Sequence, residues 1–210
     1  MIRRFLTISA AVLAIACVGK GFSAEILTLD DGNGHSTTLS STTGFLNFNG
    51  SLGDWSINVT TGISDGTADS PHLDLNSIDK YVGSGGLGST LKITFTEDGI
   101  GPFLGGAANQ VGGTLAAGMT GTFDILVNGS SIASQTFQSS PFSGTSGGVA
   151  NGGLLSTFGL QALLTANGTG IASFDSSASV PDGGATLALL GFALVGVEGF
   201  RRQLRSKISK

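Results

Sequence analysis

Residues 123–137 read FDILVNGSSIASQTF, and this stretch decides the fold class. Apolar and polar side chains alternate on both sides of Asn128-Gly129, with the two-residue period of half-buried strands. Asn-Gly readily adopts the positive φ angles that tight strand-to-strand turns require. The stretch therefore predicts a β-hairpin made of residues 123–127 and 132–137.

The same alternation recurs along much of the chain, as in residues 45–48, 55–60 and 91–96. A second hairpin is predicted from residues 160–166 and 171–174, around Asn167-Gly168. About eight to ten strands and no long helical pattern favour a mainly β protein with a single, jelly-roll-like β-sandwich over residues 25–175. We expect seven aromatic residues to supply most of its core: Phe45, Trp55, Phe95, Phe123, Phe137, Phe158 and Phe174.

Two stretches do not show this alternation. Residues 99–113 and 139–153 are rich in Gly, Ser and Ala. We expect them to be long loops, where a binding function could lie.

Charge is distributed unevenly along the chain. Between Glu25 and Val180 there are two basic residues, Lys80 and Lys92, against 12 carboxylates, a net charge of −10, whereas both ends of the chain are basic. Nucleic-acid binding needs a cationic surface, so the acidic middle excludes it.

The N-terminal residues 1–24 have the pattern of a secretory signal peptide. A basic head precedes an apolar run at residues 5–18, and small residues follow up to Ala24, the expected cleavage position. The alternative, a lipoprotein signal at Cys17, has Ala14 where a larger aliphatic residue is usual. Cleavage after Ala24 removes Cys17, so the mature protein would contain no cysteine. We therefore expect signal peptidase and the Sec machinery as partners.

The C-terminal residues 176–210 have three parts. Residues 180–184 read VPDGG, residues 185–200 are almost entirely apolar, and residues 201–210 are basic. A helix over 185–200 would be about 24 Å long, short for a membrane but able to insert by thinning the bilayer. The basic end should stay in the cytoplasm. An ordinary buried C-terminal helix is the alternative, but it would show a polar face.

These three parts resemble the PEP-CTERM class of sorting tails, in its VPDSG/VPDGG variant. The resemblance implies recognition by an exosortase, a membrane-embedded cysteine protease, with Val180, Pro181, Asp182, Gly183 and Gly184 as the recognised segment. Asp182 stands where the namesake motif has Glu, and Gly183 where the sister motif has Ser. The resemblance also implies a Gram-negative bacterium that makes exopolysaccharide, with transient inner-membrane anchoring and release to the cell surface or matrix. Residues 50–62 and 73–77 resemble the N-terminal half of PEP-CTERM proteins without an assigned role.

Residues that could carry chemistry are few. His35 and His72 lie in polar stretches that we expect to be exposed loops, without a zinc-binding pattern, and no nucleophile or phosphate-binding motif is present. Paired carboxylates could hydrolyse glycosides, but aromatic and Arg residues for a sugar cleft are scarce. We expect no enzymatic activity.

Calcium is the most reasonable ligand that the residues suggest, because acidic turns offer hard oxygen donors. The first candidate comprises Asp30, Asp31 and Asn33, and the second spans residues 65–69. Neither has EF-hand spacing, and acidic turns that keep a surface soluble are the alternative.

Three functions are weighed from the sequence. The first is a non-enzymatic surface or matrix component associated with exopolysaccharide. The second is a calcium- or carbohydrate-dependent adhesion module that binds through Trp55, Tyr81 or the turn at residues 30–33. The third, which we do not expect, is an enzyme, which would need a polar cluster that folding assembles from distant residues.

Overall fold

The computed structural model describes residues 23–67, 70–83, 89–153, 156–181 and 194. Twelve strands account for most of the described chain. They are β1 (Ala24–Asp30), β2 (Ser36–Ser41), β3 (Phe45–Leu52), β4 (Trp55–Ser64), β5 (His72–Tyr81), β6 (Ser89–Ile100), β7 (Phe103–Leu115), β8 (Met119–Val127), β9 (Ser130–Phe137), β10 (Phe142–Gly152), β11 (Ser156–Ala166) and β12 (Gly170–Ser179).

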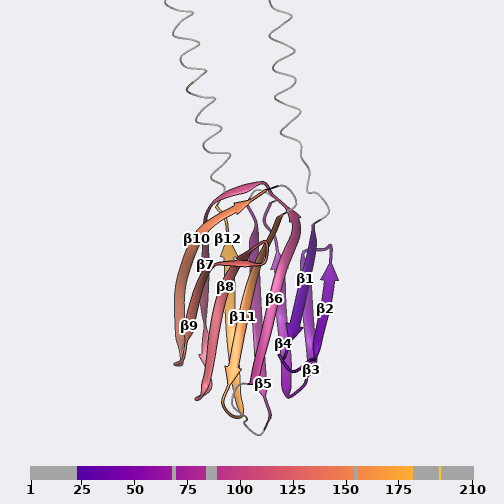
Figure 1. Ribbon diagram of the computed structural model, residues 1–210, viewed down its shortest axis with the longest axis vertical. Helices are drawn as coiled ribbons and strands as arrows, with labels where there is room; N and C mark the ends of the chain where they lie inside the picture. The colour runs from indigo at the N-terminus through magenta and orange to yellow at the C-terminus, as the bar shows by residue number, and fades with distance from the viewer. Residues whose placement is uncertain (1–22, 68–69, 84–88, 154–155, 182–193, 195–210) are drawn as a thin grey trace, which may run out of the picture.

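The strands form two six-stranded sheets, packed face to face as a β-sandwich (Figure 1). Sheet A has the order β2-β1-β6-β11-β8-β9, and sheet B has the order β10-β7-β12-β5-β4-β3. All pairs of neighbours are antiparallel. From β5 onward the chain passes repeatedly from one sheet to the other, in the jelly-roll manner. The predicted β-sandwich is confirmed, with more strands than expected.

The core lies between the sheets and is built from alternate residues of the strands. Among the predicted core aromatics, five are at most 2% exposed: Trp55, Phe95, Phe123, Phe158 and Phe174. Phe137 is half-buried and packs against Phe142, with ring centroids 4.6 Å apart. Phe45 is 45% exposed, so its assignment to the core was wrong. It begins β3 at the edge of sheet B, where its side chain points to solvent.

The hairpin predicted at residues 123–137 is confirmed as β8 and β9. Asn128 and Gly129 have φ angles of 51° and 74°, as a two-residue hairpin turn of type I′ requires. Asn128 also accepts a 3.0 Å hydrogen bond through Oδ1 from the backbone N–H of Thr157. The turn is thereby fastened to the start of β11.

The second predicted hairpin is wrong. β11 pairs with β6 and β8 in sheet A, whereas β12 pairs with β5 and β7 in sheet B. The turn at Asn167-Gly168 therefore carries the chain from one sheet to the other. A local turn signal does not decide whether the flanking strands pair with each other or with more distant partners.

The two stretches expected to be loops also form strands. β7 and β10 pair over eleven residues, from Phe142 opposite Gly113 to Gly152 opposite Phe103. Backbone pairing does not need side chains, and glycine is required where the sandwich is tight. A Cβ on Gly148 would lie 2.2 Å from the backbone oxygen of Ile132, and one on Gly152 would lie 2.3 Å from the Phe103 ring.

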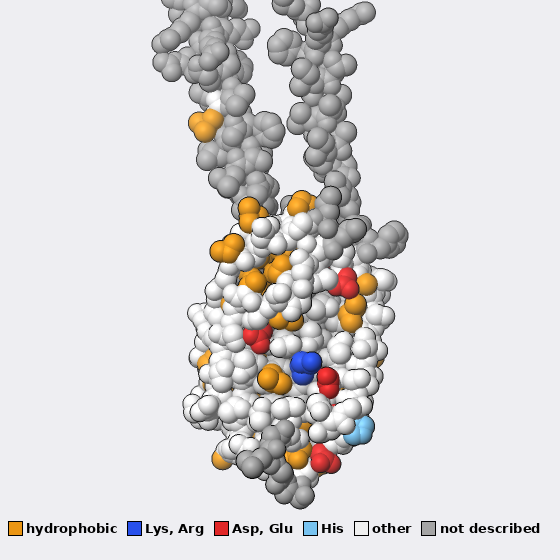
Figure 2. All heavy atoms as spheres, viewed as in Figure 1, with side chains coloured by type: hydrophobic (Ala, Val, Ile, Leu, Met, Phe, Trp, Pro, Cys, Tyr) orange, Lys and Arg blue, Asp and Glu red, His pale blue; other side chains and the backbone are white. Residues whose placement is uncertain are grey.

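The chain enters and leaves the sandwich at the same end (Figure 1), where β1 begins and β12 finishes. β12 continues to Ser179, so the sheet includes residues beyond the expected domain boundary at 175. The expected signal peptide lies outside the described residues apart from Ser23 and Ala24, and the expected transmembrane helix lies outside them apart from Leu194. Within the described ranges, no helix is long and apolar enough to cross a bilayer. Figure 2 shows that the solvent face of sheet A carries few charged side chains.

Candidate functional site

A groove with a volume of about 760 Å³ lies on the solvent face of sheet B. It crosses four adjacent strands, β5, β12, β7 and β10. Gly112 faces outward in β7 and contributes no side chain, which leaves the sheet face hollowed at that point. Gly112, Gly113 and Gly144, which looked like loop residues in the sequence, therefore line the groove with backbone alone.

The walls of the groove are polar. Alternation along each strand places amide, hydroxyl and carboxyl groups outward. Register brings them together: Asp175 lies opposite Asn76, and Ser177 lies opposite both Asp74 and Gln110. The polar side chains that line the groove are Asp74, Asn76, Gln110, Ser143, Thr145, Ser173, Asp175 and Ser177.

Two carboxyl groups meet in this groove. The pKa of Asp74 is raised, chiefly by burial, then by the negative charge of Asp175 and a hydrogen bond between the two carboxyl groups. Nearby His72 opposes this shift, and Asp65 adds to it. Like charges at close range disfavour the ionised form, in line with this direction. The carboxyl oxygens of both residues are available as hydrogen-bond acceptors to a ligand in the groove.

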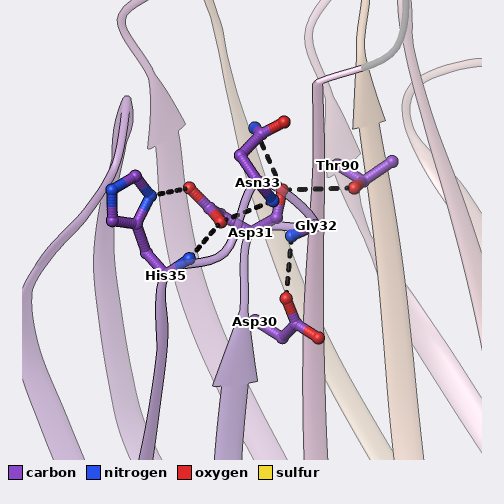
Figure 3. A network of polar contacts seen from close by, with 6 residues as sticks. All are labelled: Asp30, Asp31, Gly32, Asn33, His35 and Thr90. Carbon is purple, nitrogen blue, oxygen red and sulfur yellow. Dashed lines mark hydrogen bonds and ion pairs between the residues drawn. The ribbon is translucent and has the colours of Figure 1, made fainter.

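The first calcium candidate is a hydrogen-bonded turn (Figure 3). Asp31 is 1% exposed, and its Oδ1 accepts hydrogen bonds from the backbone N–H of Asn33 at 2.8 Å and of His35 at 3.1 Å. Its Oδ2 lies 2.7 Å from Nδ1 of His35. Burial alone would raise the pKa of Asp31, but these hydrogen bonds and the His35 charge outweigh burial and lower it.

Asp30 in the same turn is likewise engaged. Its Oδ1 accepts from the backbone N–H of Gly32 at 2.8 Å, and its Oδ2 lies 3.5 Å from Nζ of Lys92. The Asn33 amide donates to the backbone oxygen of Asp31 at 3.3 Å. Because N–H groups already interact with these oxygens, the residues are better placed to stabilise the turn than to coordinate a cation.

The second calcium candidate is only partly described. Asp65 pairs with Nδ1 of His72, and both side chains are exposed. Asp69 lies outside the described residues. Across the described ranges, no group of three or more His, Cys, Asp or Glu side chains is placed to hold a metal ion.

The two aromatic residues considered for binding are buried. Trp55 is 1% exposed and Tyr81 is 4% exposed, with their ring centroids 5.2 Å apart in the core. They are cross-strand partners on β4 and β5, on the inner face of sheet B. Binding through either ring is therefore ruled out in the folded domain, and that prediction was wrong.

The processing segments meet the sandwich at its entry and exit end. Ala24 is the first residue of β1 and pairs with Asp98. Val180 is fully buried; its N–H donates to Pro71 O at 3.0 Å, and its oxygen accepts from Ser70 Oγ at 2.8 Å. Pro181 is exposed, and residues 182–184 lie outside the described residues. The recognised segment thus begins inside the fold and emerges at Pro181.

A comparison with family models identifies this exit segment. Residues 179–204 match the VPDSG-CTERM motif. The chain carries a VPDSG-CTERM sorting signal. The resemblance to the PEP-CTERM class is confirmed by this match, and a VPDSG-CTERM signal indicates an exported cell-surface protein.

Other comparisons concern the sandwich. The CBM36-1 domain of a multidomain xylanase from the hindgut metagenome of Trinervitermes trinervoides is 18% identical, with 50% of this chain and 77% of that chain covered and a TM-score of 0.32. TmCBM61 in complex with beta-1,4-galactotriose is 6% identical (61% and 90% covered, TM-score 0.34). A PA14 sugar-binding domain from an RTX adhesin is 11% identical (75% and 90% covered, TM-score 0.34). The sequence matched no curated protein.

Sequence reasoning missed the groove. Asp74 and Asp175 are separated by 101 positions, and no local pattern links them. Each occupies an outward position of an alternating strand, which was the available signal. Only the pairing of β12 with β5 brings them together.

Proposed function

We propose that this is a non-enzymatic surface or matrix protein, released after an exosortase processes its VPDSG-CTERM tail, and that its β-sandwich binds extracellular polysaccharide in the groove of sheet B. The groove carries this proposal. An open groove across four strands suits an extended polymer better than a small ligand, which usually binds in an enclosed pocket.

The chemistry of the walls suits sugar hydroxyl groups. Carboxylates accept hydrogen bonds, amides donate and accept, and Ser and Thr hydroxyls do both, so each matches a polyhydroxylated chain. The region between Glu25 and Val180 has a net charge of −10, which repels polyanions. Neutral polysaccharides are therefore the preferred ligand class.

The carboxyl pair supports binding over hydrolysis. Glycosidases hold their two carboxyl groups about 5–9.5 Å apart, so that a sugar and, in inverting enzymes, a water fit between them. Asp74 and Asp175 instead lie close enough for the charge of Asp175 to raise the pKa of Asp74. This proximity favours binding over cleavage of a sugar chain.

Binding is tested by affinity electrophoresis and calorimetry with a panel of neutral and acidic bacterial exopolysaccharides. Gln110→Ala and Asp175→Ala should each weaken binding to a neutral polymer about tenfold, the effect of one or two lost hydrogen bonds. Asn49→Ala is the matched control, because Asn49 lines a separate hollow of about 260 Å³ on sheet B. Undiminished binding by both groove variants would contradict the assignment of the groove.

Sorting is tested separately, by mass spectrometry of the protein released by strains with and without exosortase. The proposal predicts ends near Glu25 and Pro181 in the released protein. Intact C-terminal peptide in the medium of the exosortase-positive strain would contradict the sorting step.

A further inference from the structure

Two glutamates face each other inside the sandwich, at the end where the chain enters. Glu25 on β1 and Glu97 on β6 are direct cross-strand partners. Both occupy inward positions, in line with Leu27 and Phe95, and they are 3% and 4% exposed. The fold therefore places two carboxyl groups side by side, away from water.

The described residues do not supply hydrogen bonds to all of the carboxyl oxygens of this pair. Ser64 Oγ donates to Glu97 Oε2 at 2.6 Å. Glu25 Oε2 is buried and has no hydrogen-bond partner among the described residues. Like charges directly opposite in a sheet repel, and a buried carboxylate without partners is costly. The arrangement calls for a further positive group at Glu25.

The basic residues of the domain are elsewhere. Lys80 and Lys92 are the only lysine or arginine residues between positions 25 and 180. Lys92 pairs with Asp30, five positions along the β1–β6 ladder from Glu25 and Glu97, or about 17 Å away. Lys80 lies opposite Ile171, near the start of β12, whereas Glu25 lies at the end of the sandwich where β12 finishes. Neither lysine reaches the glutamate pair.

We propose that a calcium ion binds between Glu25 and Glu97, with the Ser64 hydroxyl as a further oxygen donor. Carboxylate and hydroxyl oxygens are the ligands that hard divalent cations prefer, and calcium accepts irregular arrangements of them. One divalent ion relieves the repulsion and binds the orphaned Glu25 oxygen. The site lies on the inner side of the sheets, so it is distinct from the groove and from the turn at Asp31.

Such a site would connect export with stability. Its ligands come from β1, β6 and β4, so the ion ties the first strand to both sheets. Extracellular calcium modules commonly have dissociation constants of about 0.1–1 mM. The domain would therefore reach full stability in a calcium-containing medium outside the cell.

The test is thermal unfolding of the full chain in mild detergent micelles, followed by Trp55 fluorescence and circular dichroism. After EDTA treatment, calcium at about a hundredfold excess over its dissociation constant should raise Tm by about 5–10 °C. Glu25→Gln and Glu97→Gln should each abolish this rise. In EDTA, Glu25→Gln should unfold at the same or a higher Tm than the wild type, because it removes a buried charge.

Asp98→Asn is the matched control. Asp98 is adjacent to Glu97 on β6 but faces the other side of the sheet, so this variant should keep the calcium response. Asp30→Asn should also keep it. The proposal would be overturned if calcium does not raise the Tm of the wild type. It would also be overturned if the rise persists in Glu25→Gln, or if Asp30→Asn is the only variant that loses it. If Glu97→Gln does not fold, Glu25→Gln decides the question, because its Oε2 has no hydrogen bond to lose within the described chain.

Discussion

Asp79 lies in the core, and its replacement by Asn should change how stability depends on pH. The side chain is fully buried on β5; Ser77 Oγ donates to its Oδ1 at 2.7 Å, and its Oδ2 has no partner in the described part of the chain. Burial raises the pKa of Asp79 from 3.8 to about 7, although hydrogen bonds from Ser77 and the Asn58 backbone oppose this.

The magnitude follows from linkage. A difference of about three pKa units between the folded and unfolded states corresponds to about 4 kcal/mol. Because the folded pKa is raised, the folded state holds its proton more tightly between pH 3.8 and about 7. The free energy of unfolding should therefore fall as pH rises through this window and level off above it.

Asp79→Asn removes this dependence while keeping an acceptor for Ser77. The buried amide N–H₂ that replaces Oδ2 costs about 1–3 kcal/mol at every pH. The informative quantity is thus the free energy of unfolding of the variant minus that of the wild type. This difference should rise by up to about 4 kcal/mol in favour of the variant between pH 4 and pH 8.5.

Urea unfolding of the β domain measures this difference. Trp55 is the single tryptophan and is 1% exposed, so its fluorescence reports unfolding directly. The pKa shifts of Asp31, Asp74 and Asp98 act in both proteins and cancel in the difference. A difference that stays constant from pH 4 to pH 8.5 would refute the reasoning.

Three further predictions concern stability. Gly148→Ala should lower the free energy of unfolding in urea by about 1–3 kcal/mol, because its Cβ would meet the Ile132 backbone. Gly106→Ala should be neutral, because its Cβ would meet nothing within 4 Å. Equal costs for the two variants would contradict the packing argument. Val180→Ala should destabilise the processed protein by about 1–2 kcal/mol, since Val180 is fully buried; a processed variant as stable as wild type would mean that Val180 has left with the tail. Asp31→Ala should cost about 1–2 kcal/mol at pH 7, and the difference should shrink below pH 3.8, because the lowered pKa of Asp31 stabilises the fold only while the carboxylate is charged; acid titration of both proteins by circular dichroism checks this.

Local patterns predicted a large part of the fold. Alternation identified the strands at residues 55–60, 91–96 and 123–137, and Asn128-Gly129 identified the hairpin turn, because both signals depend on neighbouring residues alone. The sorting signal at residues 179–204 is likewise read from consecutive residues, since a linear segment is what a processing enzyme recognises.

The strand assignment failed where side chains carry little information. In β7 the apolar residues Phe103, Ala107, Val111 and Leu115 recur at even spacing and point inward, but intervening glycines obscured the pattern. The predicted pairing of β11 with β12 failed for a different reason. Which strands become neighbours depends on competing partners along the whole chain, and β6, β8, β5 and β7 won that competition.

The sequence by itself determined the class of fold, the acidic character of the domain and the linear sorting signal, because each depends on composition or on adjacent residues. Tertiary structure alone decided that Asp74 and Asp175 share a groove, that Glu25 meets Glu97, and that Trp55 and Tyr81 are closed to ligands. The physical reason is that proximity across strands and burial between sheets are set by the register of distant segments, which no local window of the chain contains.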